Sequence, residues 1–193
     1  MAEQEEQQIT ALDTPVPGPS ETGRAVALAR LLHHECSRLL QLFKEKETSF
    51  SDHTPDGGRI VSLSPAPEEP STEQQVQLLH SALRQCLGLI HCLILKEDEE
   101  WGELEGDYET LRKNVKLRLE HLLLSTKGLV ETENMTLEVT PDHQCNEETD
   151  GAGGVFGLKM WTYRVLLELV HWADHAAQTL HVLHTEREAT QEM

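Results

Sequence analysis

The sequence predicts an all-α fold, an up-up-down-down four-helix bundle with two long overhand crossover connections of the long-chain cytokine type. Apolar residues recur at three- and four-residue steps in four segments, each about 25 residues long, as in helices that bury one face. The connections between these segments are long, short and long. A short connection makes its two helices antiparallel neighbours, whereas about 20 residues can span a bundle and leave the joined helices parallel.

The first half of the chain supplies two of these helices. Residues 1–21 are acidic and rich in Gln, Pro and Thr, and we expect a disordered tail. The first helix should start at a cap, Ser20 or Thr22, and run to about Lys46. A connection with several prolines follows, and its length of about 20 residues is unusual enough to need a structural reason. The second helix should start at the capping pattern Ser71–Gln74 and end in the acidic run 97–100.

The second half supplies the other two helices. After a short break at 101–106, a third helix should run from Asp107 to about Glu131. A polar, glycine-rich connection leads to the last helix, for which we expect about 28 residues without an internal glycine after Gly157. Its predicted core face consists of Leu158, Trp161, Val165, Leu169, Trp172, Ala176, Leu180 and Leu183. The predicted domain covers residues 22–187, followed by a flexible C-terminus at 188–193.

The charge excludes several classes of partner. The net charge of −18 would repel the phosphates of nucleic acids and anionic membranes, so a partner should present a basic or mixed surface. We find no apolar window of 18 residues, and therefore expect neither a membrane span nor membrane insertion, and no signal peptide.

The cysteines and histidines do not predict a metal or cofactor site. Cys36, Cys86, Cys92 and Cys145 lack CxxC spacing, which makes zinc improbable and favours buried free thiols, although a bridge from Cys36 to Cys86 or Cys92 stays open. Glu168 and His171 have the spacing of half a di-iron site, and His175 lies one turn further on. The other half of such a site is missing from the remaining predicted helices, so His175, His181 and His184 are interpreted as solvated residues in the last turns of the helix.

The sequence also lacks the patterns of the common enzymes. It contains no GxSxG, P-loop or dinucleotide-binding glycine motif, and its serines have no placed base. We therefore predict a protein that is not an enzyme.

The candidate binding residues are Phe156 and Lys159. On a helical wheel both point away from the core face at the first turn of the last helix. An exposed aromatic ring beside a cation is typical of a contact hot spot. The alternative is that Tyr163, Leu167 and Val170, which share the Phe156 side, form a second apolar stripe beneath the first long connection.

The last helix also carries a resemblance. Its opening, GGVFGLKMWTYRVLLELVHW, resembles the last helix of the interleukin-6 family of long-chain cytokines, in which a glycine pair precedes F-x-x-K. The matching residues are Gly153, Gly154, Phe156, Lys159, Trp161, Glu168, Leu169 and Trp172. LARLL at 28–32 is similar to the start of the family's first helix, and EGD at 105–107 to the entry of its third.

The resemblance implies a neurotrophic cytokine that binds and assembles cell-surface receptors and so triggers JAK/STAT signalling. Phe156 and Lys159 would contact the leukemia inhibitory factor receptor. Exposed faces of the first and third helices would meet glycoprotein-130. An alpha receptor would meet the end of the last helix, where His175 and His181 depart from the family pattern and leave that partner open.

The resemblance further implies a cytoplasmic protein, released by a non-classical route to act extracellularly, because the family includes a member made without a signal peptide. The alternative classes are an intracellular helical-bundle adaptor and a ferritin-like metal protein. As for oligomeric state, we expect a monomer or, through the second apolar stripe, a weak dimer.

Overall fold

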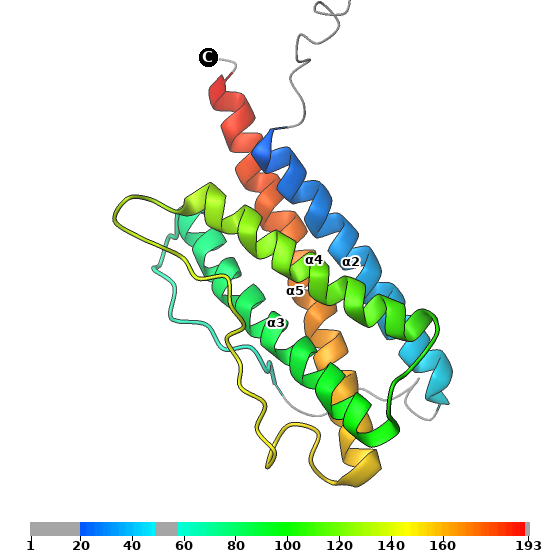
Figure 1. Cartoon of the computed structure of the whole chain (residues 1–193). Coiled ribbons are helices and arrows are strands. Elements are labelled where there is room, and N and C mark those ends of the chain that lie inside the picture. The colour runs from blue at the N-terminus through cyan, green and yellow to red at the C-terminus, as the bar shows by residue number, and fades with distance from the viewer. Residues whose placement is uncertain (1–19, 49–57, 192–193) are drawn as a thin grey trace, which may run out of the picture.

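The computed structural model describes residues 20–48 and 58–191, and four α-helices form a bundle in this part of the chain (Figure 1). The helices are α2 (Glu21–Lys46), α3 (Thr72–Trp101), α4 (Asp107–Val130) and α5 (Gly154–Gln191). The prediction of an all-α four-helix bundle is confirmed. Most of the predicted tail, residues 1–19, lies outside the described residues.

Two helices start at the caps that the sequence predicts. The Ser20 hydroxyl accepts a hydrogen bond from the backbone N–H of Gly23 at 3.2 Å, and α2 begins at the next residue. At α3, the Ser71 hydroxyl accepts from the Gln74 N–H at 3.1 Å, and the Gln74 side chain accepts from the Ser71 N–H at 2.9 Å. These bonds satisfy backbone donors that lack a partner within the helix.

The last helix is longer than the sequence suggests. It runs for 38 residues and reaches Gln191, beyond the predicted last core residue Leu183 and into the segment expected to be flexible. The reason is that its polar end has partners in other elements, since the Arg187 guanidinium donates to the carbonyl oxygen of Leu129 at 2.8 Å. All eight residues of the predicted core face are buried, which confirms the helical register.

Each helix packs against two others. α2 and α3 both contact α4 and α5. The start of α2 meets the end of α5, where Thr22 Oγ1 lies 2.7 Å from His184 Nδ1. The start of α3 meets the same end, where the Thr72 hydroxyl donates to Glu186 at 2.8 Å. The starts of α2 and α3 thus both lie beside the end of α5.

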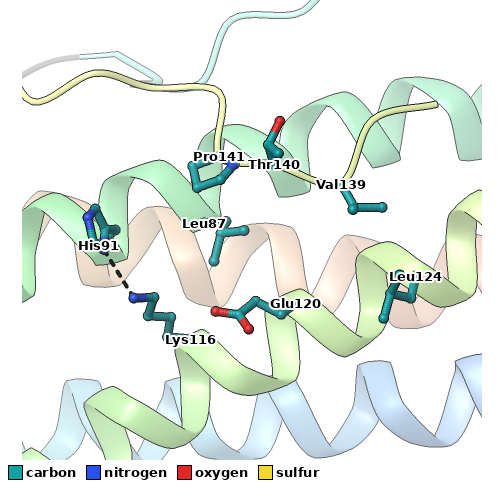
Figure 2. A pocket seen from close by; sticks show the side chains of 8 residues that line it. All are labelled: Leu87, His91, Lys116, Glu120, Leu124, Val139, Thr140 and Pro141. Carbon is teal, nitrogen blue, oxygen red and sulfur yellow. Dashed lines mark hydrogen bonds between the residues drawn. The ribbon is translucent and has the colours of Figure 1, made fainter.

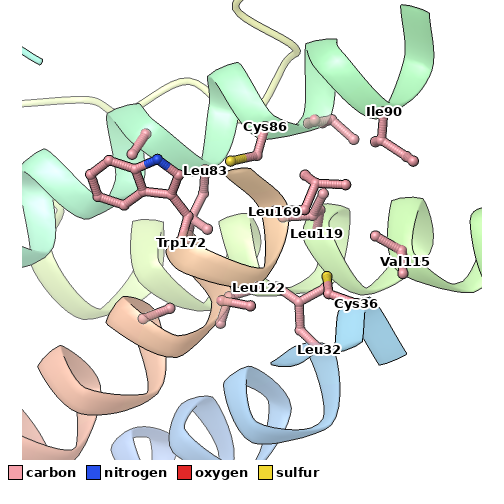
Figure 3. Packing of buried hydrophobic residues seen from close by; sticks show 14 of the residues in the cluster. Leu32, Cys36, Leu83, Cys86, Ile90, Val115, Leu119, Leu122, Leu169 and Trp172 are labelled. Atoms are coloured by element: carbon pink, nitrogen blue, oxygen red, sulfur yellow. The ribbon is translucent and has the colours of Figure 1, made fainter. Parts of the chain in front are cut away.

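The core lies between the four helices, and leucine is its commonest residue (Figure 3). Two free thiols, Cys36 and Cys86, lie within it, and burial raises the pKa of both.

The expectation that no 18-residue apolar window occurs is wrong, because α3 contains a window with a mean hydropathy of 1.5. Of that window 61% is buried inside the bundle, as expected for a helix that packs an apolar face against α4 and α5.

A buried charge cluster joins the end of α3 to the start of α4. The fully buried Arg112 donates to Glu97 and to Asp98, each at 2.9 Å, and also pairs with Glu109. The Tyr108 hydroxyl donates to the Glu97 carboxylate at 3.0 Å. Burial raises the pKa of Glu97, an effect that Arg112 partly offsets. The sequence pattern gives no sign of this cluster, because its members come from two helices.

The second long connection is attached along α3. The Asp142 N–H donates to the Arg84 carbonyl, and Arg84 Nε donates to the Thr140 carbonyl, both at 2.9 Å. Further along, Cys92 of α3 forms a disulfide with Cys145 of the connection, 53 residues away. The expectation of buried free thiols is therefore wrong for these two cysteines, and the bridges considered from Cys36 do not form.

His80 supports the same connection and makes stability depend on pH. The buried ring donates from Nε2 to the Glu138 carbonyl at 2.6 Å, and Nδ1 accepts from the Thr126 hydroxyl at 2.6 Å. Burial, together with the charges of Arg84 and Lys127, lowers the pKa of His80 below its ordinary value of 6.5. Between its folded-state pKa and 6.5 the unfolded chain binds more protons than the folded chain, so stability should fall as the pH drops below 6.5.

Urea unfolding at about pH 7.5 and about pH 5.5 tests this expectation. The His80→Gln variant should lose the part of the pH dependence that comes from the ring. Glu97 has a raised pKa and contributes in the opposite direction, but it is present in both proteins, so the difference between them reports His80. Identical pH dependence in the two proteins would show that His80 does not titrate in this way.

Candidate functional site

The start of α5 is built from glycines. Gly151, Gly153 and Gly154 have φ values of 72°, 98° and 74°, in the left-handed region that side chains other than glycine rarely adopt. A Cβ atom on Gly157 would lie 2.0 Å from the carbonyl oxygen of Ala152. The chain therefore folds back closely against the first turn of the helix, and this approach requires a glycine at 157.

The turn presents Phe156 on the surface. Its side chain is 66% exposed, the highest value among the exposed large hydrophobic residues that the structure describes. The neighbouring Val155 is exposed as well. Val155 and Phe156 therefore form an exposed apolar patch at the start of α5 in a strongly acidic protein.

The residues of the second apolar stripe on α5 are buried or partly buried, whereas Phe156 is mostly exposed. Tyr163 is buried, and its ring lies edge-on to Phe43 of α2 with 5.9 Å between the ring centroids. Leu167 and Val170 are partly buried against the core. These three residues therefore belong to the packed part of α5, and Phe156 belongs to its exposed surface.

The first long connection crosses α5 at Glu168. This buried carboxylate accepts hydrogen bonds from the Val61 N–H and from Arg59, each at 3.4 Å, and from Trp172 Nε1 at 2.9 Å. Glu168, whose spacing from His171 is that of half a di-iron site, thus anchors a connection to the helix. His171 remains on the exposed side of α5.

Lys159 lies beside Phe156 but has a partner within the chain. Its ammonium donates to the Glu47 carboxylate at the end of α2 at 3.0 Å, and the two side chains are 27% and 15% exposed. The helical wheel predicted that Lys159 points away from the core, but it could not show the contact with Glu47, because the two residues are 112 positions apart.

Two further residues extend this surface. The Lys46 ammonium lies 5.7 Å from the ring centroid of Trp101 and 5.3 Å from that of Tyr108, within range of cation–π attraction. Trp101 is 38% exposed at the end of α3. We refer to Lys46, Glu47, Trp101, Phe156 and Lys159 as the end surface. The position of Trp101 at a helix terminus within an acidic run was the signal that could have identified it.

A second candidate surface follows α2 and α4. Leu31 of α2 shares a helical face with Arg24 and Glu35, seven residues before it and four after it. Arg24 lines a cavity of about 300 Å³ with residues of α4, and Glu35 accepts from Arg118 of α4 at 2.9 Å. The exposed Leu117 and Leu124 lie on α4. We call Leu31, Leu117 and Leu124 the α2–α4 face.

A pocket of about 380 Å³ opens between α3, α4 and the second connection (Figure 2). Leu87, Val139 and Pro141 contribute apolar walls. At the polar edge of the pocket, Lys116 Nζ lies 3.1 Å from His91 Nδ1. Glu120 and Thr140 complete the polar part of the lining.

Comparison with protein-family models and with curated proteins finds no significant match. The interpretation of these surfaces therefore depends on the residues themselves.

Proposed function

We propose that the chain is a long-chain four-helix cytokine, which acts from outside the cell by bringing receptor subunits together. The observation that carries this proposal is the exposed Phe156 next to Lys159 at the glycine-built start of α5. An aromatic ring beside a cation, on a helix end that another surface can approach closely, has the composition of a binding hot spot.

Within this class, we propose a neurotrophic ligand similar to ciliary neurotrophic factor. Trp161 and Trp172, which follow Phe156 and Lys159 in the resembling segment, favour this protein over other members of the family. Its partners would be the leukemia inhibitory factor receptor, glycoprotein-130 and the ciliary neurotrophic factor alpha receptor, and their assembly would start JAK/STAT signalling.

The proposal includes the up-up-down-down topology with two overhand crossovers. It is supported by the starts of α2 and α3, which both lie against the last turns of α5. The start of α4 lies at the end of α3, where Arg112 contacts Asp98. The connections before α3 and before α5 each cover more than 20 residues, enough to run the length of a helix.

The end surface would bind the leukemia inhibitory factor receptor, and the α2–α4 face would bind glycoprotein-130. The α2–α4 face is suited to this role because Leu31, Leu117 and Leu124 are all more than one-third exposed. The two surfaces belong to different parts of the bundle, so that one ligand could hold two receptor chains.

The Phe156→Ala variant is expected to weaken binding to the leukemia inhibitory factor receptor by about 30- to 700-fold, corresponding to about 2–4 kcal/mol for a central hot spot. Surface binding of the purified chain to the receptor ectodomain measures this loss. The free energy of unfolding should change by less than about 0.5 kcal/mol, because the ring is mostly exposed. The matched control is Leu95→Ala, which removes a 52% exposed apolar side chain from α3 and should leave binding unchanged.

Lys159 needs a separate variant because it already pairs with Glu47. Lys159→Ala should weaken binding, whereas Glu47→Gln should maintain or strengthen it by releasing the ammonium to the receptor. If the folded wild-type chain does not bind, even with glycoprotein-130 and the alpha receptor supplied, the cytokine proposal fails and the intracellular adaptor becomes the better explanation.

A further inference from the structure

The segment 142–150 brings three metal-ligating side chains together against α3. Cys92 of α3, together with Cys145 and Asp150 of the segment, places one ligand atom from each residue within 4.8 Å of the others. Cys92 and Asp150 are buried, while Cys145 is exposed. We propose that reduction of the Cys92–Cys145 disulfide converts this group into a zinc site with Cys92, Cys145 and Asp150 as ligands. The inference is independent of the proposed function.

Contacts other than the disulfide hold the segment on α3. A Cβ atom on Gly88 would lie 2.6 Å from His143 Cβ and 2.8 Å from the His143 backbone nitrogen, so the segment rests directly on the helix at this glycine. Gly88 and Cys92 lie one turn apart on the same helical face. The Asp142 N–H also donates to the Arg84 carbonyl at 2.9 Å. These contacts should keep Cys145 opposite Cys92 after the sulfur–sulfur bond is broken.

Asp150 is already oriented by its neighbours. Its Oδ2 accepts hydrogen bonds from His143 Nε2 at 2.6 Å and from the Asn146 N–H at 2.9 Å. Its Oδ1 has a longer contact, 3.4 Å, with the Thr149 hydroxyl. Carboxylates that bind metals are commonly oriented in this way, by hydrogen bonds from neighbouring groups to the ligating side chain.

The ligand types favour zinc over harder cations. Two thiolates and one carboxylate suit Zn²⁺, whereas Mg²⁺ and Ca²⁺ prefer oxygen ligands only. Because Cys145 is exposed, water can reach the fourth position of a tetrahedral site. The spacing of the cysteines gave no sign of this site, because Cys92 belongs to a helix and its partners come from a connection 53 residues or more along the chain.

The two states interconvert by thiol–disulfide exchange. When a small disulfide such as oxidised glutathione is the oxidant, the two zinc-bound thiolates lose two electrons and form the Cys92–Cys145 bond. The oxidant's disulfide takes up these electrons and two protons from water to become two thiols, and Zn²⁺ leaves with water in its coordination shell. A reducing compartment thus favours the zinc form, and an oxidising one the disulfide form.

Cobalt(II) titration of the full chain, reduced with a thiol-free phosphine, tests the proposal. Bound thiolates give a sulfur-to-cobalt charge-transfer band, which we expect to saturate at one equivalent of cobalt per chain and to disappear when zinc is added. Cys145→Ser should abolish the band, and Asp150→Asn should weaken cobalt binding. His143→Ala should weaken it about 10- to 100-fold, as expected for a positioning residue.

Two controls separate this site from other ligands. Cys36→Ala removes a buried core thiol, and the His171→Ala/His175→Ala variant removes the exposed histidine pair on α5. Both should retain the band, provided that circular dichroism confirms their helicity. Absence of the band in the reduced wild-type chain, or its persistence in Cys145→Ser, would overturn the proposal.

Oxidation supplies an independent measurement. Oxidised glutathione added to the zinc-loaded chain should release one equivalent of zinc to a chromogenic chelator, and subsequent reduction should restore binding. Retention of zinc while the Cys92–Cys145 disulfide forms, as followed by mass spectrometry, would show that these thiols are not the ligands.

Discussion

Replacing Arg112 with alanine is expected to lower the free energy of unfolding by about 3–5 kcal/mol. The guanidinium is fully buried and contacts three acidic side chains, of which Glu97 and Glu109 have little access to solvent. Its removal would leave Glu97 and Glu109 without the buried guanidinium between them, and the remaining cation on Glu109, Lys113, has a side chain that is 70% exposed. Urea unfolding of the variant beside the wild type measures the loss.

Arg118→Ala is the matched control for this prediction. Arg118 also lies on α4 and donates to a carboxylate, Glu35, at 2.9 Å, but its side chain is 29% exposed. Water can therefore replace part of the interaction, and we expect a loss of about 1 kcal/mol. An equal loss in the two variants would mean that burial of the Arg112 cluster contributes little.

Cys145→Ser is expected to lower the free energy of unfolding of the oxidised protein by about 4 kcal/mol. The disulfide closes a loop of 53 residues, which restricts the unfolded chain far more than the folded one. Chemical denaturation under oxidising conditions, with the wild type as reference, tests this value. Reduction of the wild type in the absence of metal should produce a similar loss.

The Cys145→Ser variant should keep Asp142 and His143 seated on α3 although its free energy of unfolding is lower. Since Asp142 and His143 are seated on α3 by non-covalent contacts, the amide of Asp142 should remain protected from hydrogen exchange in Cys145→Ser under native conditions. Loss of protection there, without global unfolding, would show that the disulfide alone holds the segment.

Local sequence patterns predicted most of the helical architecture. The caps at Ser20 and Ser71 form because a hydroxyl before an amphipathic run can bind the free N–H groups of the first turn. All eight residues of the predicted core face of α5, Trp161 and Trp172 among them, are buried because one helical register places them on the same side of the helix.

Interactions between distant segments could not be predicted in the same way. Arg112 lies in the polar stretch DYETLRKN, which resembles a solvated helix start, and only the position of α3 makes it buried. The Cys92–Cys145 bond depends on the path of an irregular connection. The predicted end of α5 came too early in the chain. Arg187 donates a hydrogen bond to the backbone carbonyl of Leu129 on α4, and the sequence pattern does not show this contact.

The candidate site was predicted in part for the same reason. The helical wheel placed Phe156 on the surface correctly, since exposure of a side chain on a regular helix follows from its angle. The wheel could not show that Lys159 meets Glu47, because that contact depends on how α2 and α5 are aligned.

The position of Trp101 has a consequence for optical measurements. Trp161 and Trp172 are buried, so their fluorescence should be shielded from quenchers dissolved in water. Trp101 is partly exposed on the end surface and lies under the Lys46 ammonium. The chain thus carries an intrinsic fluorophore at this end, whose emission and accessibility to acrylamide would report a partner that docks there without any attached dye.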